Sequence, residues 1–281
     1  MARRMLVVHM GGLGDFLLCC PALKCLARDF VIELLGRPAR LELAVAGGIA
    51  EKAHNIESSG FESLFIAPDD TILALLAPFD AAVVWMRDED GTLKRAIQSC
   101  GVADVRVFPG LPPEGWSRHA SEYYLEQLGL SDSKPFRLTL PHEGTGTDVV
   151  IHAGSGSARK NWPLERFVTL AEILESRDRT VHWCLGPAEA GMMLPENAQM
   201  FTPDSPSGLA RWLSAARAYV GNDSGVTHLA AACGVRTTAI FGPTDPRIWA
   251  PKGGNVQVLH GTPWPSEQAV VESVCESLQE A

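Results

Sequence analysis

Long apolar runs and dense basic segments are both missing from this sequence of 281 residues. No stretch approaches the roughly 18 to 20 uninterrupted apolar residues that a membrane-spanning helix needs, so no transmembrane segment is expected. The formal net charge is −9 and the lysines and arginines are not clustered, which argues against a nucleic-acid partner. An acidic protein of this kind can still carry a local basic site for a phosphate.

Cysteine pairs with metal-binding or redox spacing are also missing. The seven cysteines include no Cys-x-x-Cys pair, and their odd number does not fit a disulfide framework. Reduced thiols are typical of cytoplasmic proteins. Arg3 and Arg4 precede an apolar run, as in a signal peptide, but glycines and Asp15 interrupt that run. A buried strand fits this run better, and we expect a cytoplasmic protein.

What the sequence does contain is an alternation of short β-rich runs with helical segments. This alternation predicts an α/β fold with parallel sheets covered on both faces. Prolines and glycines between positions 135 and 146 indicate a linker. The predicted strands occupy residues 5–10, 31–35, 63–67, 81–86, 105–108, 149–152, 181–185, 218–221 and 237–241.

We therefore expect two Rossmann-like domains, residues 1–143 and 144–265, whose parallel sheets face each other across a cleft. Residues 266–281 are expected to form a terminal helix that packs back on the first domain. Open α/β sheets bind ligands at the carboxyl ends of their strands, so the loops that follow strands are the candidate sites.

The first candidate loop is MGGLGD at residues 10–15, directly after the first strand. Its glycines allow the backbone to turn sharply and to approach a ligand closely. Asp15 would lie in the first turn of the following helix, where it either stabilises the positive helix end or offers a carboxylate to a ligand. The loop is neither Gly-x-Gly-x-x-Gly nor a phosphate loop, which argues against a dinucleotide-dependent oxidoreductase.

The second candidate loop is HAGSGSARKNWP at residues 152–163. Its glycines and serines offer free N–H groups and hydroxyls, and Lys160 adds a positive charge just before a helix that is expected to open at Pro163. Such a combination suits a diphosphate group. The alternative interpretation is a flexible loop with a solvated lysine.

The third candidate loop is GNDSGVTH at residues 221–228, between a strand and an alanine-rich helix. Either Asp223 or Ser224 could simply cap that helix. In the functional interpretation, the first-turn N–H groups face an anion and His228 donates to a phosphate oxygen. A lone histidine of this kind is more often a structural group.

Two rigid turns and one acidic string add further candidates. Thr244, in FGPTDP, could offer a hydroxyl to the same phosphates, and Glu189, in GPAE, could accept hydrogen bonds from a ribose diol. The string Asp88-Glu89-Asp90 has the Asp-x-Asp spacing that can hold a metal ion. Because it is far in sequence from the phosphate loops, we interpret it as a solvated loop and expect no metal site.

With these motifs in this order, the sequence resembles glycosyltransferase family 9, the ADP-heptose:lipopolysaccharide heptosyltransferase type, which has the GT-B fold. The resemblance rests on LGD at residues 13–15, the loop at 152–163, GNDSGVTHLAAACG at 221–234 and FGPTDP at 241–246. It implies an inverting, metal-independent transfer of heptose or a similar sugar from a nucleotide-diphosphate donor. The implied acceptor is a lipopolysaccharide-core or related glycan, lipid-linked at the inner membrane surface.

The resemblance also implies roles for single residues. Asp15 stands at the position of the general base, Lys160 at that of the diphosphate-binding lysine, and Glu189 at a nucleoside contact. His9 replaces an arginine that the family usually carries, and it belongs with Gly12 and Gly14 to the loop on the acceptor side. The expected donor-binding residues are Ser155, Gly156, Lys160, Glu189, Asp223, Ser224, Gly225, His228 and Thr244.

Two other functions fit the same layout. The first is a non-catalytic protein that binds a nucleotide sugar, which the short chain and His9 favour and Asp15 disfavours. The second is a sugar-nucleotide epimerase, which would act on the donor without any acceptor.

Overall fold

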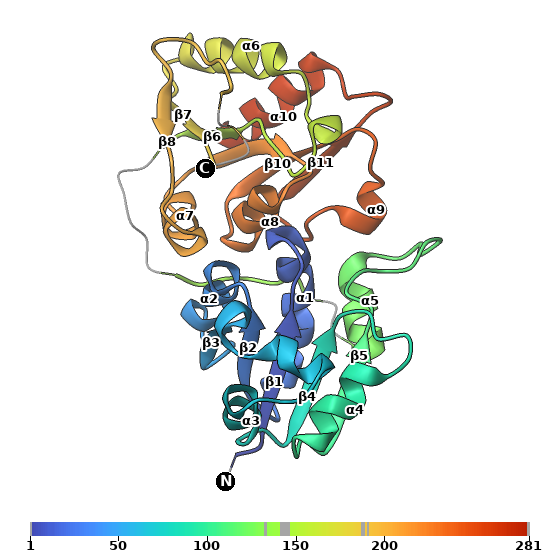
Figure 1. Ribbon diagram of the computed structural model, residues 1–281. Coiled ribbons are helices and arrows are strands. Elements are labelled where there is room, and N and C mark those ends of the chain that lie inside the picture. Colours follow the sequence, from blue (N-terminus) through green and yellow to red (C-terminus); the bar gives the residue numbers. More distant parts are fainter. Residues whose placement is uncertain (1, 132–133, 141–146, 187–188, 190, 280–281) are drawn as a thin grey trace. The chain divides into compact units, whose positions relative to one another are not determined.

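The chain folds into two compact α/β units (Figure 1). The computed structural model describes residues 2–131, 134–140, 147–186, 189 and 191–279. The first unit comprises residues 1–116 and 120–134, and the second comprises 117–119 and 135–281. The boundary expected at residues 143 and 144 lies outside the described residues. Apart from the short segment 117–119, the chain passes from the first unit to the second between Lys134 and Pro135.

The first unit is built on a five-stranded sheet with the order β3-β2-β1-β4-β5. All of its strand pairs are parallel. The strands are β1 (Arg4–His9), β2 (Val31–Gly36), β3 (Lys52–Asn55), β4 (Ala81–Trp85) and β5 (Asp104–Phe108). The helices are α1 (Leu13–Leu26), α2 (Pro38–Ala46), η1 (Ile56–Ser58), η2 (Phe61–Phe65), α3 (Asp70–Leu76), α4 (Thr92–Ser99) and α5 (Ala120–Gln127).

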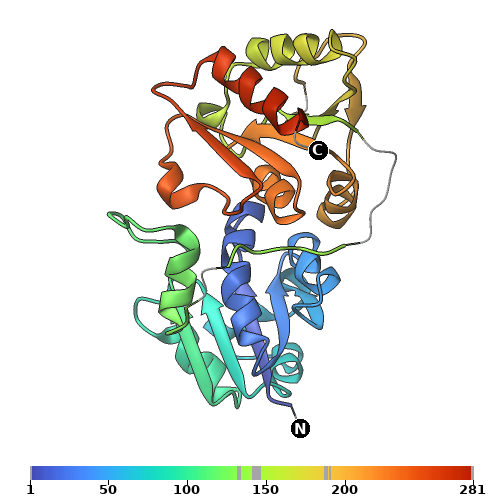
Figure 2. The same ribbon diagram turned by 180° about the vertical axis from the view of Figure 1, so that it is seen from behind.

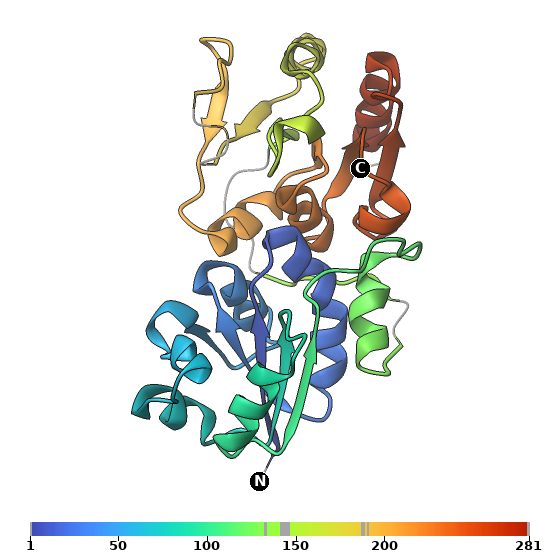
Figure 3. The ribbon, with the colours of Figure 1, turned by 45° about the vertical axis from the view of Figure 1, so that its right-hand side comes forward.

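The apolar strands of this unit lie at its centre. Every residue of β4 is buried, as expected for a parallel strand covered on both faces. On one face, Leu6 and Val8 of β1 join a core with side chains of η2, α3 and α4. On the other face, α1 and α5 lie side by side (Figures 2 and 3).

The second unit repeats this plan with a six-stranded parallel sheet of order β11-β10-β9-β6-β7-β8. The strands are β6 (Val149–His152), β7 (Val181–Cys184), β8 (Gln199–Phe201), β9 (Ala218–Asn222), β10 (Arg236–Phe241) and β11 (Val256–His260). The helices are η3 (Ala158–Lys160), α6 (Leu164–Glu175), α7 (Pro206–Leu213), α8 (Gly225–Ala232), α9 (Pro246–Trp249) and α10 (Glu267–Gln279).

The core of the second unit contains the buried faces of α6 and α10, which contact each other (Figure 2). Trp162 packs edge to face on Phe167, with the ring centroids 4.9 Å apart. From α10, Val270, Val274 and Leu278 enter the same core. The apolar face of α10 is therefore used within the second unit. The expectation that the terminal helix also packs back on the first domain stays a prediction.

The two-domain α/β prediction is confirmed, but one strand prediction is wrong. Residues 63–67 were expected to form a strand, whereas Phe61–Phe65 is the short 3-10 helix η2. Gly60 precedes it in the left-handed conformation, with φ of 70°, and the Ser63 hydroxyl donates to the Gly60 carbonyl at 2.6 Å. Local side-chain bonds of this kind favour a turn over a strand.

Three strands lack the apolar run that predicts a strand. The strands β3, β8 and β11 are edge strands of their sheets. Every residue in them is either half-buried or exposed. Since the apolar signal comes from burial on both faces, such strands are not detectable from hydrophobicity alone.

In both sheets the strand order reverses beside the first strand of the unit. The reversal falls between β1 and β4 in the first sheet and between β6 and β9 in the second. At such a point the loops after two neighbouring strands lead to opposite faces of the sheet. Ligands of open α/β sheets bind at the carboxyl ends of these two strands.

The docking of α10 gives a stability prediction. Val274→Ala should lower the free energy of unfolding by about 2 kcal/mol, because two buried methyl groups are lost from the core. Glu276→Ala, at an exposed position of the same helix, should change it by less than about 0.5 kcal/mol. Urea denaturation followed by tryptophan fluorescence measures both variants. Equal effects would contradict the packing of α10 in this core.

Candidate functional site

The predicted loops lie at the strand ends that flank the two reversals of strand order. In the first unit, His9 ends β1 and is paired in register with Trp85, which ends β4. In the second unit, His152 ends β6 and Asn222 ends the neighbouring β9. The fold therefore places the sequence motifs where this class of sheet binds ligands.

Asp15 lies in the first turn of α1 and is half-buried. Its Oδ2 accepts a hydrogen bond from the backbone N–H of Gly12, the N-cap residue, at 2.8 Å. Gly14 lies between them in the same turn. A side chain at Gly11 would come within 2.8 Å of both the Asp15 Cβ and the His9 ring. The glycine-rich loop thus allows the carboxylate to pack back on its own backbone.

His9 is buried, with 3% of its surface exposed. Its ring packs against those of Phe16, Trp85 and Tyr124. Within the described chain, its Nε2 has no hydrogen-bond partner. Burial, reinforced by the positive charge of Arg40, lowers the pKa of His9 to about 4. The imidazole is therefore neutral near neutral pH and does not supply the positive charge of an arginine at that position.

Arg40, in the first turn of α2, is a site residue that the sequence motifs did not indicate. Its Nη1 donates to the carbonyl oxygen of Gly11 at 2.6 Å. The guanidinium thus contacts the loop that carries Asp15 from the neighbouring strand-to-helix connection. A single arginine after a predicted strand carries no motif, so only the parallel pairing of β1 and β2 relates it to this loop.

In the second unit, Lys160 and Thr244 converge on Asp223. Lys160 Nζ and Thr244 Oγ1 each lie 2.8 Å from Asp223 Oδ2. The Lys160 side chain is 35% exposed, whereas that of Asp223 is 8% exposed. The lysine is thus held in place by a largely buried carboxylate while part of it faces solvent.

Helix α8 begins directly beside this cluster. The Ser224 side chain caps it by accepting the backbone N–H of Thr227 at 3.3 Å, and Gly225 is the first helical residue. His228, one turn in, is buried. Burial lowers the pKa of His228 to about 4 in spite of the nearby Asp223 carboxylate. A neutral His228 and the positive helix end both lie close to the Lys160 ammonium.

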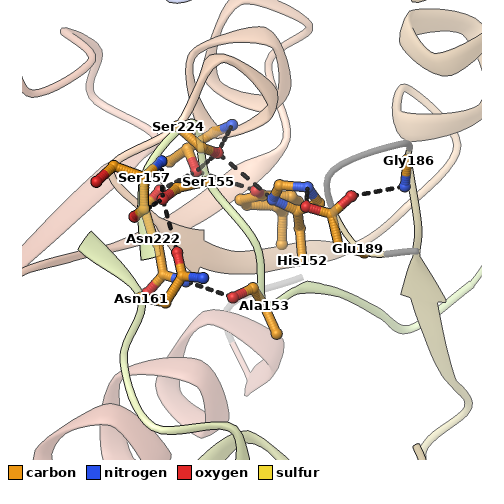
Figure 4. Close-up of polar contacts among 11 residues, drawn as sticks. His152, Ala153, Ser155, Ser157, Asn161, Gly186, Glu189, Asn222 and Ser224 are labelled. Carbon is orange, nitrogen blue, oxygen red and sulfur yellow. Dashed lines mark hydrogen bonds and ion pairs between the residues drawn. The ribbon is translucent and has the colours of Figure 1, made fainter. Parts of the chain in front are cut away.

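The loop after β6 is ordered by its own side chains (Figure 4). Ser155 Oγ lies 2.7 Å from the carbonyl oxygen of Ser157 and 2.6 Å from Asn161 Oδ1. Its hydroxyl therefore serves the loop in this structure. At Gly156 nothing lies within 4 Å of where a Cβ would be, so this position opens to space.

Asn222 ties this loop to the end of β9, and it was not among the predicted site residues. Its Oδ1 accepts the backbone N–H of Trp162 at 2.8 Å and its Nδ2 donates to the carbonyl of Ala153 at 2.7 Å. The side chain is fully buried. Both bonds are made to backbone groups on either side of Lys160, so Asn222 fixes the loop that carries the lysine. The sequence does contain a signal for Asn222, because this residue lies within the third candidate loop, GNDSGVTH.

Glu189 follows β7 and is buried beside Gly154. Its side chain is 2% exposed, and a Cβ at Gly154 would overlap its carboxylate. Oε2 accepts the N–H of Gly186 at 2.7 Å (Figure 4). Nε2 of His152 lies 3.4 Å from Oε1, within ion-pair range but outside hydrogen-bond geometry, so Oε1 has no hydrogen bond in the described part of the chain.

The charge state of Glu189 follows from these neighbours. Burial by itself raises the pKa of its carboxyl, but His152 and the Gly186 N–H favour the ionised form and bring the pKa below its ordinary value. A buried carboxylate oxygen without a hydrogen bond is energetically costly. Oε1 is therefore a candidate to accept a hydrogen bond from an N–H or O–H group of a ligand.

The acidic string at 88–90 has a structural role. Both oxygens of Asp88 accept first-turn N–H groups of α4, from Leu93 at 2.9 Å and Lys94 at 3.0 Å. Asp90 accepts the N–H and hydroxyl of Thr92. Among the described residues, no group of three or more histidine, cysteine, aspartate or glutamate side chains is arranged to hold a metal ion.

Within the described ranges, none of the helices has the length and apolar character needed to cross a bilayer.

Comparison with known proteins gives both a family and a fold. A family model described as glycosyltransferase family 9 (heptosyltransferase) matches residues 123–278. Lipopolysaccharide heptosyltransferase 1 of Pseudomonas aeruginosa is 34% identical over 177 residues, which cover 57% of this chain and 50% of that protein. The match therefore spans about half the length of this curated relative.

Solved structures of such proteins superpose on nearly the whole chain. The glycosyl transferase family 9 structure from Veillonella parvula has a TM-score of 0.78 at 18% identity and covers 100% of this chain and 98% of that one. E. coli heptosyltransferase WaaC with ADP gives 0.69 at 18% identity, covering 98% and 99%. The dodecameric iron-containing heptosyltransferase TibC, solved in complex with ADP-D-beta-D-heptose, has a TM-score of 0.58 at 17% identity. It covers 88% of this chain and 60% of its own.

These likenesses confirm the GT-B prediction, with two Rossmann-like units. The family match spans the loop after β6, which carries Lys160, and the turn before α8, which carries Asp223. With more than half of its length matched by the family model, this chain belongs to glycosyltransferase family 9.

Proposed function

We propose that this protein is an inverting glycosyltransferase that moves a heptose or similar sugar from a nucleotide-diphosphate donor to a hydroxyl of a lipopolysaccharide-core or related glycan acceptor. The observation that carries the proposal is the cluster of Lys160, Asp223 and Thr244 at the N-terminus of α8. We assign the donor to the second unit, and the acceptor and the general base to the first.

The second unit meets the electrostatic need of the leaving group. Transfer of the sugar leaves one more negative charge on the departing diphosphate, on the oxygen that was bonded to the sugar. Lys160 offers a positive charge, the α8 N-terminus offers oriented N–H groups, and Thr244 offers a hydroxyl. Groups fixed before the reaction stabilise developing charge most effectively. The clamp made by Asn222 and the pairing with Asp223 provide that fixation for Lys160.

The first unit offers the base that the acceptor needs. The acceptor hydroxyl must lose its proton as it attacks the sugar, and a base must lie about 2.6 to 3.2 Å from that oxygen. Asp15 Oδ2 is occupied by the Gly12 N–H, whereas Oδ1 accepts no hydrogen bond from the described residues. We therefore assign the proton transfer to Oδ1.

The named relatives support the choice of donor. One is called a lipopolysaccharide heptosyltransferase, one was solved with ADP and another with ADP-D-beta-D-heptose. For this chain we accordingly propose ADP-heptose as the first donor to test. Glu189 Oε1, which has no hydrogen bond in the described residues, would accept one from a ribose hydroxyl of the bound donor. The protein would work in the cytoplasm, peripheral to the inner membrane where the acceptor lies.

The direct test incubates the protein with ADP-heptose, with and without a lipopolysaccharide core that lacks heptose. A transferase releases ADP and extends the core only when both substrates are present. An epimerase would convert the donor alone, and a binding protein would consume nothing. Either of these results would contradict the proposed transfer.

Lys160→Ala should weaken the binding of a nucleoside diphosphate by about 10- to 100-fold, because one charge-assisted hydrogen bond to a phosphate is lost. Arg159→Ala, the exposed neighbour in η3, should leave the affinity within about twofold. Isothermal titration calorimetry with ADP measures both. Similar affinities for the two variants would remove Lys160 from the donor site.

Asp15→Asn should lower kcat by about 100- to 10,000-fold, the usual contribution of a general base. Donor affinity should persist, because the change is isosteric and lies in the other unit. Asp29→Asn, exposed beyond the far end of the same helix, is the matched control. Near-normal turnover by Asp15→Asn would refute the assignment of the base.

We also propose that no metal ion takes part, with Lys160 and the α8 N-terminus in the role that a metal plays elsewhere. Transfer should then continue at an unchanged rate in excess EDTA, and added Mg²⁺ or Fe²⁺ should not raise it. A loss of activity on chelation that a metal restores would contradict this.

A further inference from the structure

One peptide group connects Arg40 with Asp15. The carbonyl oxygen of Gly11 accepts a hydrogen bond from Arg40 Nη1 at 2.6 Å. The N–H of Gly12, which belongs to the same peptide group, donates to Asp15 Oδ2 at 2.8 Å. A cation, a peptide and an anion therefore form one short hydrogen-bonded chain at the carboxyl end of β1.

The two bonds of this chain reinforce each other. A guanidinium at the carbonyl oxygen draws electron density toward that oxygen and makes the N–H at the other end of the peptide a better donor. A bond from an N–H to a carboxylate is already stronger than a neutral one. The positive charge of Arg40 therefore strengthens the bond that holds Asp15 Oδ2, although the guanidinium does not bond to the carboxylate itself.

The fold holds both ends of this series of hydrogen bonds, at Arg40 and at Asp15. Arg40 lies in the first turn of α2, directly after β2, which pairs with β1 in parallel register. Gly11 is confined between Asp15 and the buried His9 ring, where an added Cβ would meet both at 2.8 Å. Within the described residues no carboxylate forms an ion pair with Arg40, so its charge is not neutralised by an acidic side chain.

We propose that Arg40 is a positioning residue for Asp15, acting through the Gly11–Gly12 peptide group. By fixing Oδ2 it leaves Oδ1 as the oxygen that faces the acceptor hydroxyl. The kinetic consequence rests on the proposed function, in which Asp15 is the general base. The coupling between the two side chains does not depend on it and can be measured without substrate.

The first experiment observes the peptide group directly. In a protein labelled with 15N and carbonyl 13C in glycine alone, an HNCO spectrum shows only peptide groups between two glycines. The sequence has three of these, at residues 11–12, 47–48 and 253–254. Gly47→Ala, where φ is −83° and suits any residue, and Gly254→Ala, where a side chain meets nothing within 4 Å, remove two of the signals and so assign the third.

Arg40→Ala should move the Gly12 amide proton upfield, because its bond to Asp15 weakens, and Asp15→Asn should move it in the same direction. Arg37→Ala, an exposed arginine at the start of the same helix with no side-chain capping bond, should leave it in place. The other two glycine pairs serve as internal references. A Gly12 proton that ignores Arg40→Ala would overturn the coupling.

The second experiment is a double-mutant cycle in the transfer reaction. Arg40→Ala should lower kcat about tenfold, with the donor KM within about twofold, and Arg40→Lys should recover part of the loss because the charge is kept. In the Asp15→Asn background, Arg40→Ala should cost less than about twofold more, since the group it acts through is already disabled.

An equal loss from Arg40→Ala in both backgrounds would overturn the positioning role, because Arg40 would then act independently of Asp15. So would a loss confined to the donor KM. If the unmodified protein transfers no sugar while the Gly12 proton still responds to Arg40, the proposed function fails and the coupling stands.

Discussion

All paired strands in each sheet run in one direction, so every loop that follows a strand leaves its unit from the same edge. The reversal of strand order then parts two neighbouring loops at β1 and β4, and again at β6 and β9. Backbone N–H groups at a helix start remain available there for an anion or for a side chain. Asp15 uses one in the first unit, and the start of α8 lies beside Lys160 in the second. The common direction of the strands thus determines where the loops that carry Asp15 and Lys160 lie in each unit.

Buried polar side chains turn these loops into fixed sites. Asn222 satisfies two backbone groups that flank Lys160, and Asp223 holds the lysine and Thr244 with a single oxygen. In the first unit the chain from Arg40 to Asp15 has a similar effect with one peptide group. Hydrogen bonds that are partly shielded from water are stronger than those in bulk water, and connected bonds of this kind restrict the side chains that they join. Each unit therefore holds its charged group in place before any ligand arrives.

The sequence predicted the family, the fold class and the central strands, because buried parallel strands and glycine-rich loops leave clear local signals. It missed β3, β8 and β11, whose exposure removes the apolar pattern, and it assigned a strand to η2, where side-chain bonds to the backbone prevail. Among site residues, Lys160 and Asp223 came from motifs. Arg40 did not, because its contact with Gly11 depends on the pairing of β1 with β2 and not on nearby sequence. The burial of Glu189 was equally invisible, since it requires Gly154 from another strand end.

If Lys160 binds the diphosphate as proposed, its ion pair with Asp223 has a consequence for the release of the nucleotide product. An unpaired lysine would bind any diphosphate with its full attraction, the released nucleotide included. Here the ammonium already has a carboxylate at 2.8 Å, so a phosphate gains only the difference between two anionic partners. In the proposed reaction, Lys160 would still have Asp223 as its partner after the nucleotide departs, so no unpaired charge would be left. In the proposed transfer, the pair would limit product inhibition because it stabilises the site when no nucleotide is bound.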